Sequence, residues 1–272
     1  MKISKTLYRL LILFFLVMLL ISGFHIVRYI IDTIGQKNEY DALAAQVEAS
    51  RVERLPHPTT VSAPVPAPEA PSDPVIETEP VILPEYAALY EDNQDLIGWM
   101  RIDGTSVNYP VMQTPDQIDF YLDHNFKKEP NSHGCLYVRE SCDVFAPSDN
   151  LTIYGHHMRN GTMFASLDKF QQKEFWQQYQ TINFDTLYEH HTYTVFAVFR
   201  TTATLGEGFD YHLFEDAADE AEFNDFVSTC KSLAIYDTGI TPEYGDKMIC
   251  LSTCEYSQTN GRLVVAAVRN QP

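Results

Sequence analysis

The sequence predicts a mainly β fold, an antiparallel barrel decorated with helices, which follows an N-terminal membrane segment. Short β-type runs separated by turn residues dominate the chain after residue 96, a pattern that is typical of β-sandwiches and barrels. Helical patterns are inserted between some of these runs, which favours a sheet covered by helices. No internal repeat is visible. At 272 residues the chain has room for one sizeable domain and accessory segments.

The first element is an apolar run that we expect to span a membrane. Residues 10–31 supply the about 20 residues that the ~30 Å hydrocarbon core requires, and Arg28 would extend to the far interface. Basic residues precede the run and Asp32 follows it, which places residues 1–9 in the cytoplasm and the rest outside. A cleaved signal peptide is the alternative, but its apolar region would cover only about 7–15 residues, and Ser22-Gly23 is a poor cleavage site.

Residues 32–83 are expected to form a juxtamembrane helix and an extracellular linker. The segment 36–54 is charged and rich in alanine, which suits a short helix. Nine of the fifteen prolines lie between residues 56 and 84, and such a stretch forms an extended, polyproline-like spacer rather than a packed core. A ligand for SH3-type domains is the alternative, but a spacer fits an extracellular location better. The folded domain is therefore predicted to cover residues 84–272.

The folded domain is predicted to begin with a helix over 85–94, whose apolar residues share one face. Pro110 argues for an edge or irregular position in the second strand. Helical turns are expected within 163–180, and an amphipathic helix is expected over 216–234. The β-type runs that are bounded by turn signals predict strands at 97–102, 107–112, 134–138, 151–154, 192–199, 247–254 and 262–269.

Charge and cysteine content restrict the possible partners. The formal net charge of −18 argues against nucleic acid, because its binders need basic patches that neutralise phosphates. The five cysteines are an odd number, which leaves at least one free thiol or an intermolecular bridge in an exported protein. Cys135 and Cys142 could form a local disulfide, or they could be two small buried residues. Their spacing leaves both interpretations open.

The most informative segment is the hairpin predicted by residues 247–269. Its first strand ends at Cys254, its loop is polar, and Arg262 begins the return strand, so a thiol and a guanidinium would face each other. Strand side chains alternate, which puts Cys250 inside the strand, as expected of a structural thiol. Cys254 lies beside the loop, where reactive groups are commonly found. The pattern indicates covalent chemistry by Cys254, with a buried structural thiol as the alternative.

A reactive thiol needs a proton acceptor or a nearby cation. Among nine histidines, His156 follows the strand 151–154 after Gly155, and glycine permits a bend or a close approach. Ordinary packing is the alternative for a single histidine. Zinc is another chemistry of cysteine and histidine, but residues four apart on a strand, such as Cys250 and Cys254, lie ~13 Å apart. They cannot bind one ion without a turn, so we expect no metal site.

These residues resemble the motifs of the sortases, the cysteine transpeptidases of Gram-positive bacteria. The match consists of Leu251-Ser-Thr-Cys254, Arg262 on the next strand and His156 after a strand-end glycine. The inserted helical segment before the last hairpin is similar to that of class B sortases. Further similarity to class B lies in residues 95–104, 107–113, 121–122, 154–158 and 161–164.

The resemblance implies a closed eight-stranded sortase-type β-barrel with an N-terminal helix and an inserted helix before the catalytic strand. It also implies a catalytic site in which Cys254 forms a thioester, His156 transfers protons and Arg262 stabilises the developing oxyanion. Ser252 and Leu122 match family positions near the substrate groove. No cofactor is expected, and the calcium site of some class A members is not expected either.

The substrates implied by the resemblance are surface proteins with a C-terminal sorting motif, and the acceptor is an amine of a peptidoglycan precursor or a pilin lysine. The enzyme would be a single-pass protein of the cell membrane with its catalytic domain outside. One alternative is a thiol protease, which transfers the acyl group to water. Another is a non-catalytic anchored assembly module. A papain-like peptidase fits less well, because its cysteine begins a helix whereas Cys254 ends a strand.

Overall fold

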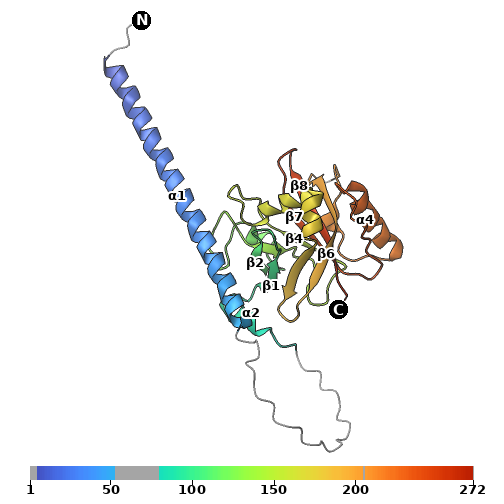
Figure 1. Cartoon of the computed structure of the whole chain (residues 1–272). Helices are drawn as coiled ribbons and strands as arrows, with labels where there is room; N and C mark the ends of the chain where they lie inside the picture. The colour runs from blue at the N-terminus through green and yellow to red at the C-terminus, as the bar shows by residue number, and fades with distance from the viewer. Residues whose placement is uncertain (1–4, 53–79, 205, 272) are drawn as a thin grey trace, which may run out of the picture. The chain divides into compact units, whose positions relative to one another are not determined.

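The chain contains a long N-terminal helix and a β-barrel (Figure 1). The residues that the computed structural model describes are 5–52, 80–204 and 206–271. They divide into two compact units, one ending at Ala42 and the other beginning at Leu43. Helix α1 (Lys5–Val52) is continuous across this boundary, so the predicted juxtamembrane helix is the end of one long helix. Most of the predicted proline-rich spacer, residues 53–79, lies outside the described residues.

The large apolar side chains of α1 between Tyr8 and Ile34 are exposed. By length and composition, the helix from Tyr8 to Val52 is apolar enough to cross a membrane, a property that membrane spans share with signal sequences. An exposed apolar surface of this extent normally marks an interaction with a membrane or another protein. Helix α1 is therefore a candidate membrane anchor.

Eight strands close into one barrel within the unit that begins at Leu43. Their order around the barrel is β1-β2-β3-β4-β7-β8-β6-β5. The expected closed eight-stranded barrel is thus confirmed, and every predicted strand is present. The strands are β1 (Leu96–Arg101), β2 (Asn108–Met112), β3 (Leu136–Val138), β4 (Asn150–Tyr154), β5 (Thr181–Thr186), β6 (Thr192–Thr202), β7 (Met248–Cys254) and β8 (Gly261–Arg269).

The directions of the strands differ in part from the prediction. The pairs β2–β3 and β4–β7 are parallel, so the prediction of an antiparallel barrel was wrong for these two pairs. An alternating apolar pattern reports which face is buried, but it does not report the direction of the neighbouring strand. Parallel strands need a crossover connection, and the crossover from β4 to β7 includes β5 and β6. As a result, β4 and β7 end at the same edge of the barrel.

Strand β5 and Pro110 show two further differences in detail. Strand β5 pairs with β1 and β6, and it was missed although Ile182 and Phe184 alternate with polar residues. Pro110 lies inside β2 opposite Trp99 of β1. The ladder from β2 to β3 begins one residue later. Pro110 therefore lies where only β1 pairs with β2, a position that tolerates the missing N–H group.

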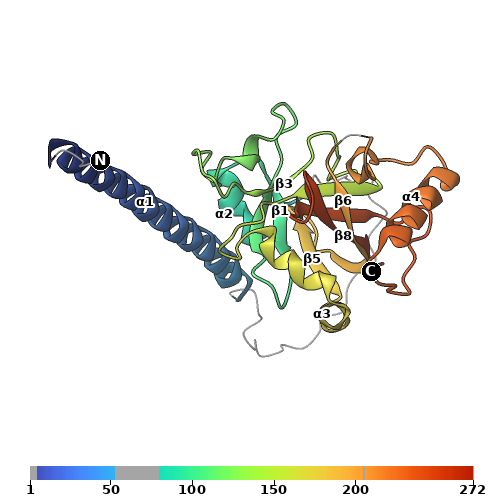
Figure 2. The ribbon, with the colours of Figure 1, turned by 90° about the horizontal axis from the view of Figure 1, so that it is seen from above.

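Helix α4 (Glu220–Leu233) covers one face of the strands that form the predicted hairpin, and Figure 2 shows it beside β6 and β8. The Asp219 side chain accepts a hydrogen bond from the Glu222 N–H at 3.0 Å, so this N-cap begins the helix later than residue 216. Burying each large apolar side chain contributes about 1.5–3 kcal/mol. The cluster contains Phe223, Phe226, Val227 and Cys230 of α4 together with Met248, Cys250, Val264, Ala266 and Val268.

The shorter helices agree with the predicted positions. Helix α2 (Pro84–Asp92) begins with proline, which is favoured in the first turn because its fixed φ suits a helix. The predicted helical turns within 163–180 form the 3-10 helix η2 (Phe164–Gln171) and helix α3 (Lys173–Gln178). Two single 3-10 turns, η1 (Phe120–Leu122) and η3 (Tyr211–Leu213), were not predicted. Both carry residues that line the candidate site.

Candidate active site

Strands β7 and β8 form the predicted hairpin, and their register places Cys254 directly opposite Arg262. Cys254 is the last residue of β7 and is partly exposed. One guanidinium nitrogen of Arg262 donates to the carbonyl of Gly261 at 3.0 Å and to that of Asn260 at 3.4 Å. Within the described part of the chain, Arg262 makes no ion pair. Its charge is therefore available to a ligand at this edge of the barrel.

The loop of this hairpin is fixed by main-chain contacts. The Glu255 N–H donates to the carbonyl of Gly261 at 2.9 Å, and the Gly261 N–H donates to that of Gln258 at 3.2 Å. The Gln258 side chain donates to the Thr201 carbonyl of β6 at 2.8 Å. A Cβ atom at Gly261 would lie 2.4 Å from the Glu255 oxygen, so the close approach requires glycine. These contacts hold the two strand ends at a constant separation.

His156 lies at the same edge as Cys254 because β4 runs parallel to β7. The last pair in their register is Tyr154 with Ser252, so His156 and Cys254 each follow that pair by two residues. Parallel strands end at the same edge of a sheet. The Nε2 atom of His156 lies 2.7 Å from the carbonyl oxygen of Leu122 in the turn η1. The histidine is thus placed by a neighbouring strand and by a backbone carbonyl.

Gly155 permits the close packing that was predicted for the position before His156. Its N–H donates to the Ser252 carbonyl at 3.1 Å, and its carbonyl accepts from the Thr253 hydroxyl at 2.8 Å. A Cβ atom here would lie 2.6 Å from carbon atoms of Leu136 and Phe164. The chain therefore passes against β7 at a position where only glycine fits.

A cavity of about 510 Å³ opens at this edge of the barrel. The Leu122 side chain is 42% exposed at its border, whereas Ser252 is buried. Strand ends and one turn thus bring together residues that are far apart in the sequence. The cavity is lined by every residue that the sequence predicted for the site: Leu122, His156, Ser252, Cys254 and Arg262.

One wall of this cavity comes from the turn η3, which was not predicted from the sequence. The Tyr211 hydroxyl lies 2.5 Å from the Ser252 hydroxyl, and burial raises the pKa of Tyr211 to about 12. Burial, followed by the charges of Arg139 and Arg262, lowers the pKa of His212. Arg139 donates to the His212 carbonyl and joins this turn to the end of β3. No spacing rule connects these residues in sequence, so only the fold reveals them.

The other four thiols are buried. Neither Cys135 nor Cys142 takes part in a disulfide in the structure, so the bridge that their spacing allowed is not formed. Burial raises the pKa of Cys142 to about 11, and burial also raises the pKa of Cys230 and Cys250. Thiols in such surroundings stay protonated and inert. Among the described cysteines, Cys254 is the one that a substrate can reach.

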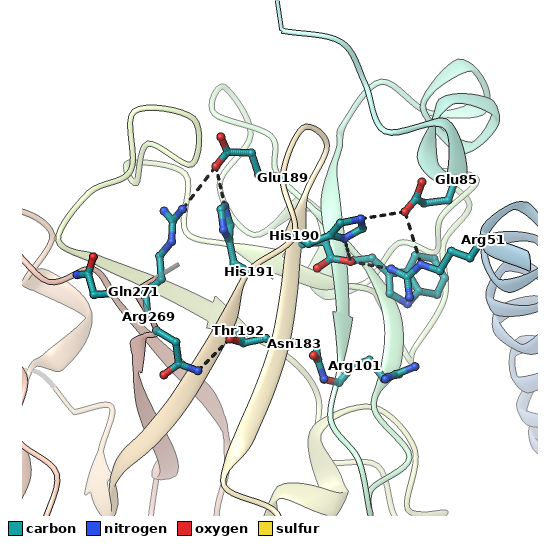
Figure 3. A pocket seen from close by; sticks show the side chains of 13 residues that line it. Arg51, Glu85, Arg101, Asn183, Glu189, His190, His191, Thr192, Arg269 and Gln271 are labelled. Carbon is teal, nitrogen blue, oxygen red and sulfur yellow. Dashed lines mark hydrogen bonds and ion pairs between the residues drawn. The ribbon is translucent and has the colours of Figure 1, made fainter. Parts of the chain in front are cut away.

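A larger cavity of about 990 Å³ lies at the other end of β8, beside Arg269 (Figure 3). Its charged side chains other than Arg101 pair with one another. His190 lies 3.3 Å from a carboxylate oxygen of Glu85 and 3.0 Å from one of Asp185, and Arg269 lies 3.5 Å from Glu189. None of the described residues that line it is a cysteine. The smaller cavity, which contains Cys254, is therefore the candidate site for the covalent chemistry that the sequence suggested.

Known proteins resemble this chain over most of the unit that contains the barrel. A family model described as the sortase domain matches residues 100–270. Sortase B of Staphylococcus aureus is 29% identical over 188 residues, which are 68% of this chain and 75% of that protein. Sortase B of Listeria monocytogenes is 30% identical over 183 residues, 66% of this chain and 72% of that protein. The crystal structure of sortase B from B. anthracis in complex with AAEK1 has a TM-score of 0.70 and 27% identity, and the match covers 89% of this chain and 100% of that one.

Proposed function

Because this chain belongs to the sortase family of cysteine transpeptidases, we propose that Cys254, His156 and Arg262 are its catalytic residues. The observation that carries the proposal is the partly exposed Cys254 thiol opposite an arginine that makes no ion pair among the described residues. His156 follows the end of the parallel strand β4 by two residues and lies beside them. A thiol, a proton carrier and a fixed cation at one cavity are the groups that acyl transfer through a thioester requires.

In the first half-reaction, the Cys254 thiolate attacks a backbone carbonyl carbon of the sorting motif. The carbonyl electron pair moves onto oxygen, and the guanidinium of Arg262 stabilises this oxyanion, because its charge is fixed in place before the reaction. The electron pair then returns, the carbon–nitrogen bond breaks, and His156 gives a proton to the leaving amine. The products are a thioester on Cys254 and a released C-terminal fragment.

In the second half-reaction, an acceptor amine attacks the thioester carbonyl. His156 takes the proton that the amine loses, a new amide bond forms, and the Cys254 sulfur leaves as a thiolate. The histidine thus regains the proton that it gave away in the first half-reaction. The cycle consumes no cofactor and ends with the enzyme in its starting protonation state.

The substrates in this proposal are surface proteins with a C-terminal sorting motif. The acceptor is an amine of a peptidoglycan precursor or a pilin lysine. Leu122 would contact substrate side chains, since its own side chain is exposed at the border of the cavity. Ser252 would shape the cavity floor together with Tyr211, to which its hydroxyl is hydrogen-bonded. These two residues would select the peptide, whereas the catalytic residues act on its backbone.

We also propose a membrane location with the catalytic domain outside the cell. Residues 1–9 would lie in the cytoplasm, 10–31 would span the membrane, 32–83 would link the anchor to the domain, and 84–272 would form the catalytic domain. The exposed apolar face of α1 supports an anchor, and the basic residues before the span favour this orientation.

The test compares the full-length protein with its Cys254→Ala variant in detergent, using a library of sorting peptides with and without an added amine. The native protein should cleave a peptide and join it to the amine, and the variant should do neither. Retained activity in Cys254→Ala would refute the proposal. A hydrolase would give the same carboxylate product with and without the amine. Slow alkylation of Cys254 in the folded protein would support a non-catalytic module.

A further inference from the structure

We propose that the backbone carbonyl of Leu122 fixes the tautomer and orientation of His156, so that Nδ1 is the nitrogen that exchanges protons, and that Gly134 holds this carbonyl in place. The inference rests on the proposed function, because it assigns a role to Leu122 and Gly134 only if His156 transfers protons. The Leu122 carbonyl and Gly134 would be positioning groups, since they act through His156, whereas the Leu122 side chain would contact the substrate separately.

The first step concerns the contact between Nε2 of His156 and the Leu122 oxygen, which are 2.7 Å apart. A carbonyl oxygen has no proton to donate and can only accept. The Nε2 atom must therefore carry the proton in this hydrogen bond. In a neutral imidazole only one nitrogen carries a proton, so Nδ1 is left as the basic atom.

The second step concerns the two protonation states through which His156 passes. When Nδ1 takes a proton from the acceptor amine, both ring nitrogens become donors. The Nε2 hydrogen bond to the Leu122 carbonyl remains and becomes charge-assisted. The ring therefore needs no rotation between the two half-reactions, because its anchoring bond is compatible with both states. A carboxylate at the same place would stabilise the charged ring much more, whereas a carbonyl orients it and leaves it free to lose its proton.

The third step concerns Gly134, which holds the Leu122 carbonyl in position. Gly134 has φ +55° and packs against this turn: a Cβ atom there would lie 2.5 Å from the Leu122 oxygen and 2.4 Å from the Tyr121 oxygen. The next residue, Cys135, donates its N–H to the Tyr121 carbonyl at 2.9 Å. Any side chain at residue 134 must therefore displace the carbonyl that contacts His156.

The turn η1 is also fixed by the side chain of Tyr121, which is fully buried. Its hydroxyl donates to a carboxylate oxygen of Asp95 at 2.8 Å and accepts from the Asn93 amide at 2.8 Å. The Leu122 N–H donates to the Asp119 carbonyl at 2.9 Å. The carbonyl is thus part of a rigid turn, which is what an orienting group requires.

The side chain and the carbonyl of Leu122 can be separated by two substitutions. Leu122→Ala shortens the side chain at the border of the cavity and keeps the carbonyl. Gly134→Ala keeps every side chain of the cavity and displaces the carbonyl. Gly239→Ala is the matched control, because Gly239 also has a positive φ (+77°) but has open space around it. It introduces similar backbone strain in the loop between α4 and β7.

The experiment records nitrogen-15 spectra of the histidine rings in the full-length protein in detergent. A Cys254→Ala background removes the thiol as a proton partner, and the His156→Asn difference spectrum assigns the ring. Neutral His156 should carry its proton on Nε2. In the native background, Gly134→Ala should lower kcat by about 10- to 100-fold, the range expected when a catalytic group is misplaced by about 1 Å. KM should change little, Leu122→Ala should mainly raise KM, and Gly239→Ala should retain the native kcat.

A neutral ring with its proton on Nδ1 would overturn the inference, and so would a native kcat in a folded Gly134→Ala protein. The spectrum of the parent protein answers the first question even if Gly134→Ala does not fold. His156→Asn separates this inference from the proposed function. If that variant keeps the native rate, the proposed role of His156 fails. If it is inactive while the parent ring carries its proton on Nδ1, only the present inference fails.

Discussion

The paired hydroxyl groups of Tyr211 and Ser252 give a quantitative test of how the cavity wall is attached to β7. Their oxygen atoms are 2.5 Å apart, and this hydrogen bond joins the turn η3 to the strand that ends at Cys254. The perturbation is a double-mutant cycle that consists of Tyr211→Phe, Ser252→Ala and the combined variant. Each single substitution removes one hydroxyl group and leaves the other in place.

The expected magnitude follows from burial. Tyr211 is 2% exposed and Ser252 is 1% exposed, so neither hydroxyl can replace its lost partner with bulk water. A buried polar group that is left unpaired costs about 1–3 kcal/mol, and each single variant should lose this much free energy of unfolding. The combined variant leaves no unpaired hydroxyl, so it should be less destabilised than the sum of the singles. The coupling free energy should be about 1–2 kcal/mol.

The assay is reversible unfolding of the detergent-solubilised protein, followed by near-ultraviolet circular dichroism. Tyr154→Phe is the matched control, since Tyr154 lines the same cavity and its hydroxyl makes no hydrogen bond with another described residue. It should change the free energy of unfolding by no more than about 0.5 kcal/mol. Strict additivity of the single variants would refute the reasoning, and so would a Tyr211→Phe protein as stable as the native one.

Further predictions concern Arg262, Gly155 and the thiols. Arg262→Ala should lower kcat by about 10²- to 10³-fold, because it removes an oxyanion-stabilising group. The kcat of Arg262→Lys should lie between those of Arg262→Ala and the native protein. A native kcat in Arg262→Ala would contradict this role. Gly155→Ala should destabilise the protein by about 1–3 kcal/mol in thermal unfolding, because its Cβ would overlap two side chains. Peptide mapping after brief alkylation should find label mainly on Cys254, since the other four thiols are buried; equal labelling would contradict this. The free energy of unfolding should fall between pH 9 and 11, because burial raises the pKa of Cys142 from 9.0 to about 11 and the unfolded chain loses this proton first. The difference between these two pKa values corresponds to roughly 3 kcal/mol of unfolding free energy. In Cys142→Ser this free energy should fall less steeply with pH than in the native protein. The same dependence on pH in both proteins would contradict the prediction.

Local patterns were sufficient to predict the hairpin. The alternation that ends at Cys254, the polar loop and the arginine at its far side are all determined by neighbours in sequence. An antiparallel hairpin then requires its two ends to meet, which is why the register of Cys254 with Arg262 agrees with the prediction. Gly155 was likewise identifiable, because a glycine between a strand and a polar residue commonly marks a close approach.

Non-local features could not be predicted from the same patterns. The parallel pairing of β4 with β7 depends on a crossover that contains β5 and β6, and no periodicity in either strand reports it. Tyr211 reaches Ser252 from a turn on that crossover. The contact between the Leu122 carbonyl and His156 could not be predicted either, because every residue has a backbone carbonyl and the residue type does not mark it. The sequence patterns thus predicted candidate site residues, which the fold brings to one cavity, but not the turns and main-chain groups that surround them.

Strand β8 is the last strand of the chain, yet it lies between β7 and β6 in the barrel. Until it is inserted, both neighbours have unpaired edges and Cys254 has no cation opposite it. A chain is synthesised from its N-terminus, so the barrel closes only after Arg269 has been made. The order of the strands therefore delays completion of the cavity: a chain that still lacks β8 carries the Cys254 thiol but not the Arg262 guanidinium opposite it.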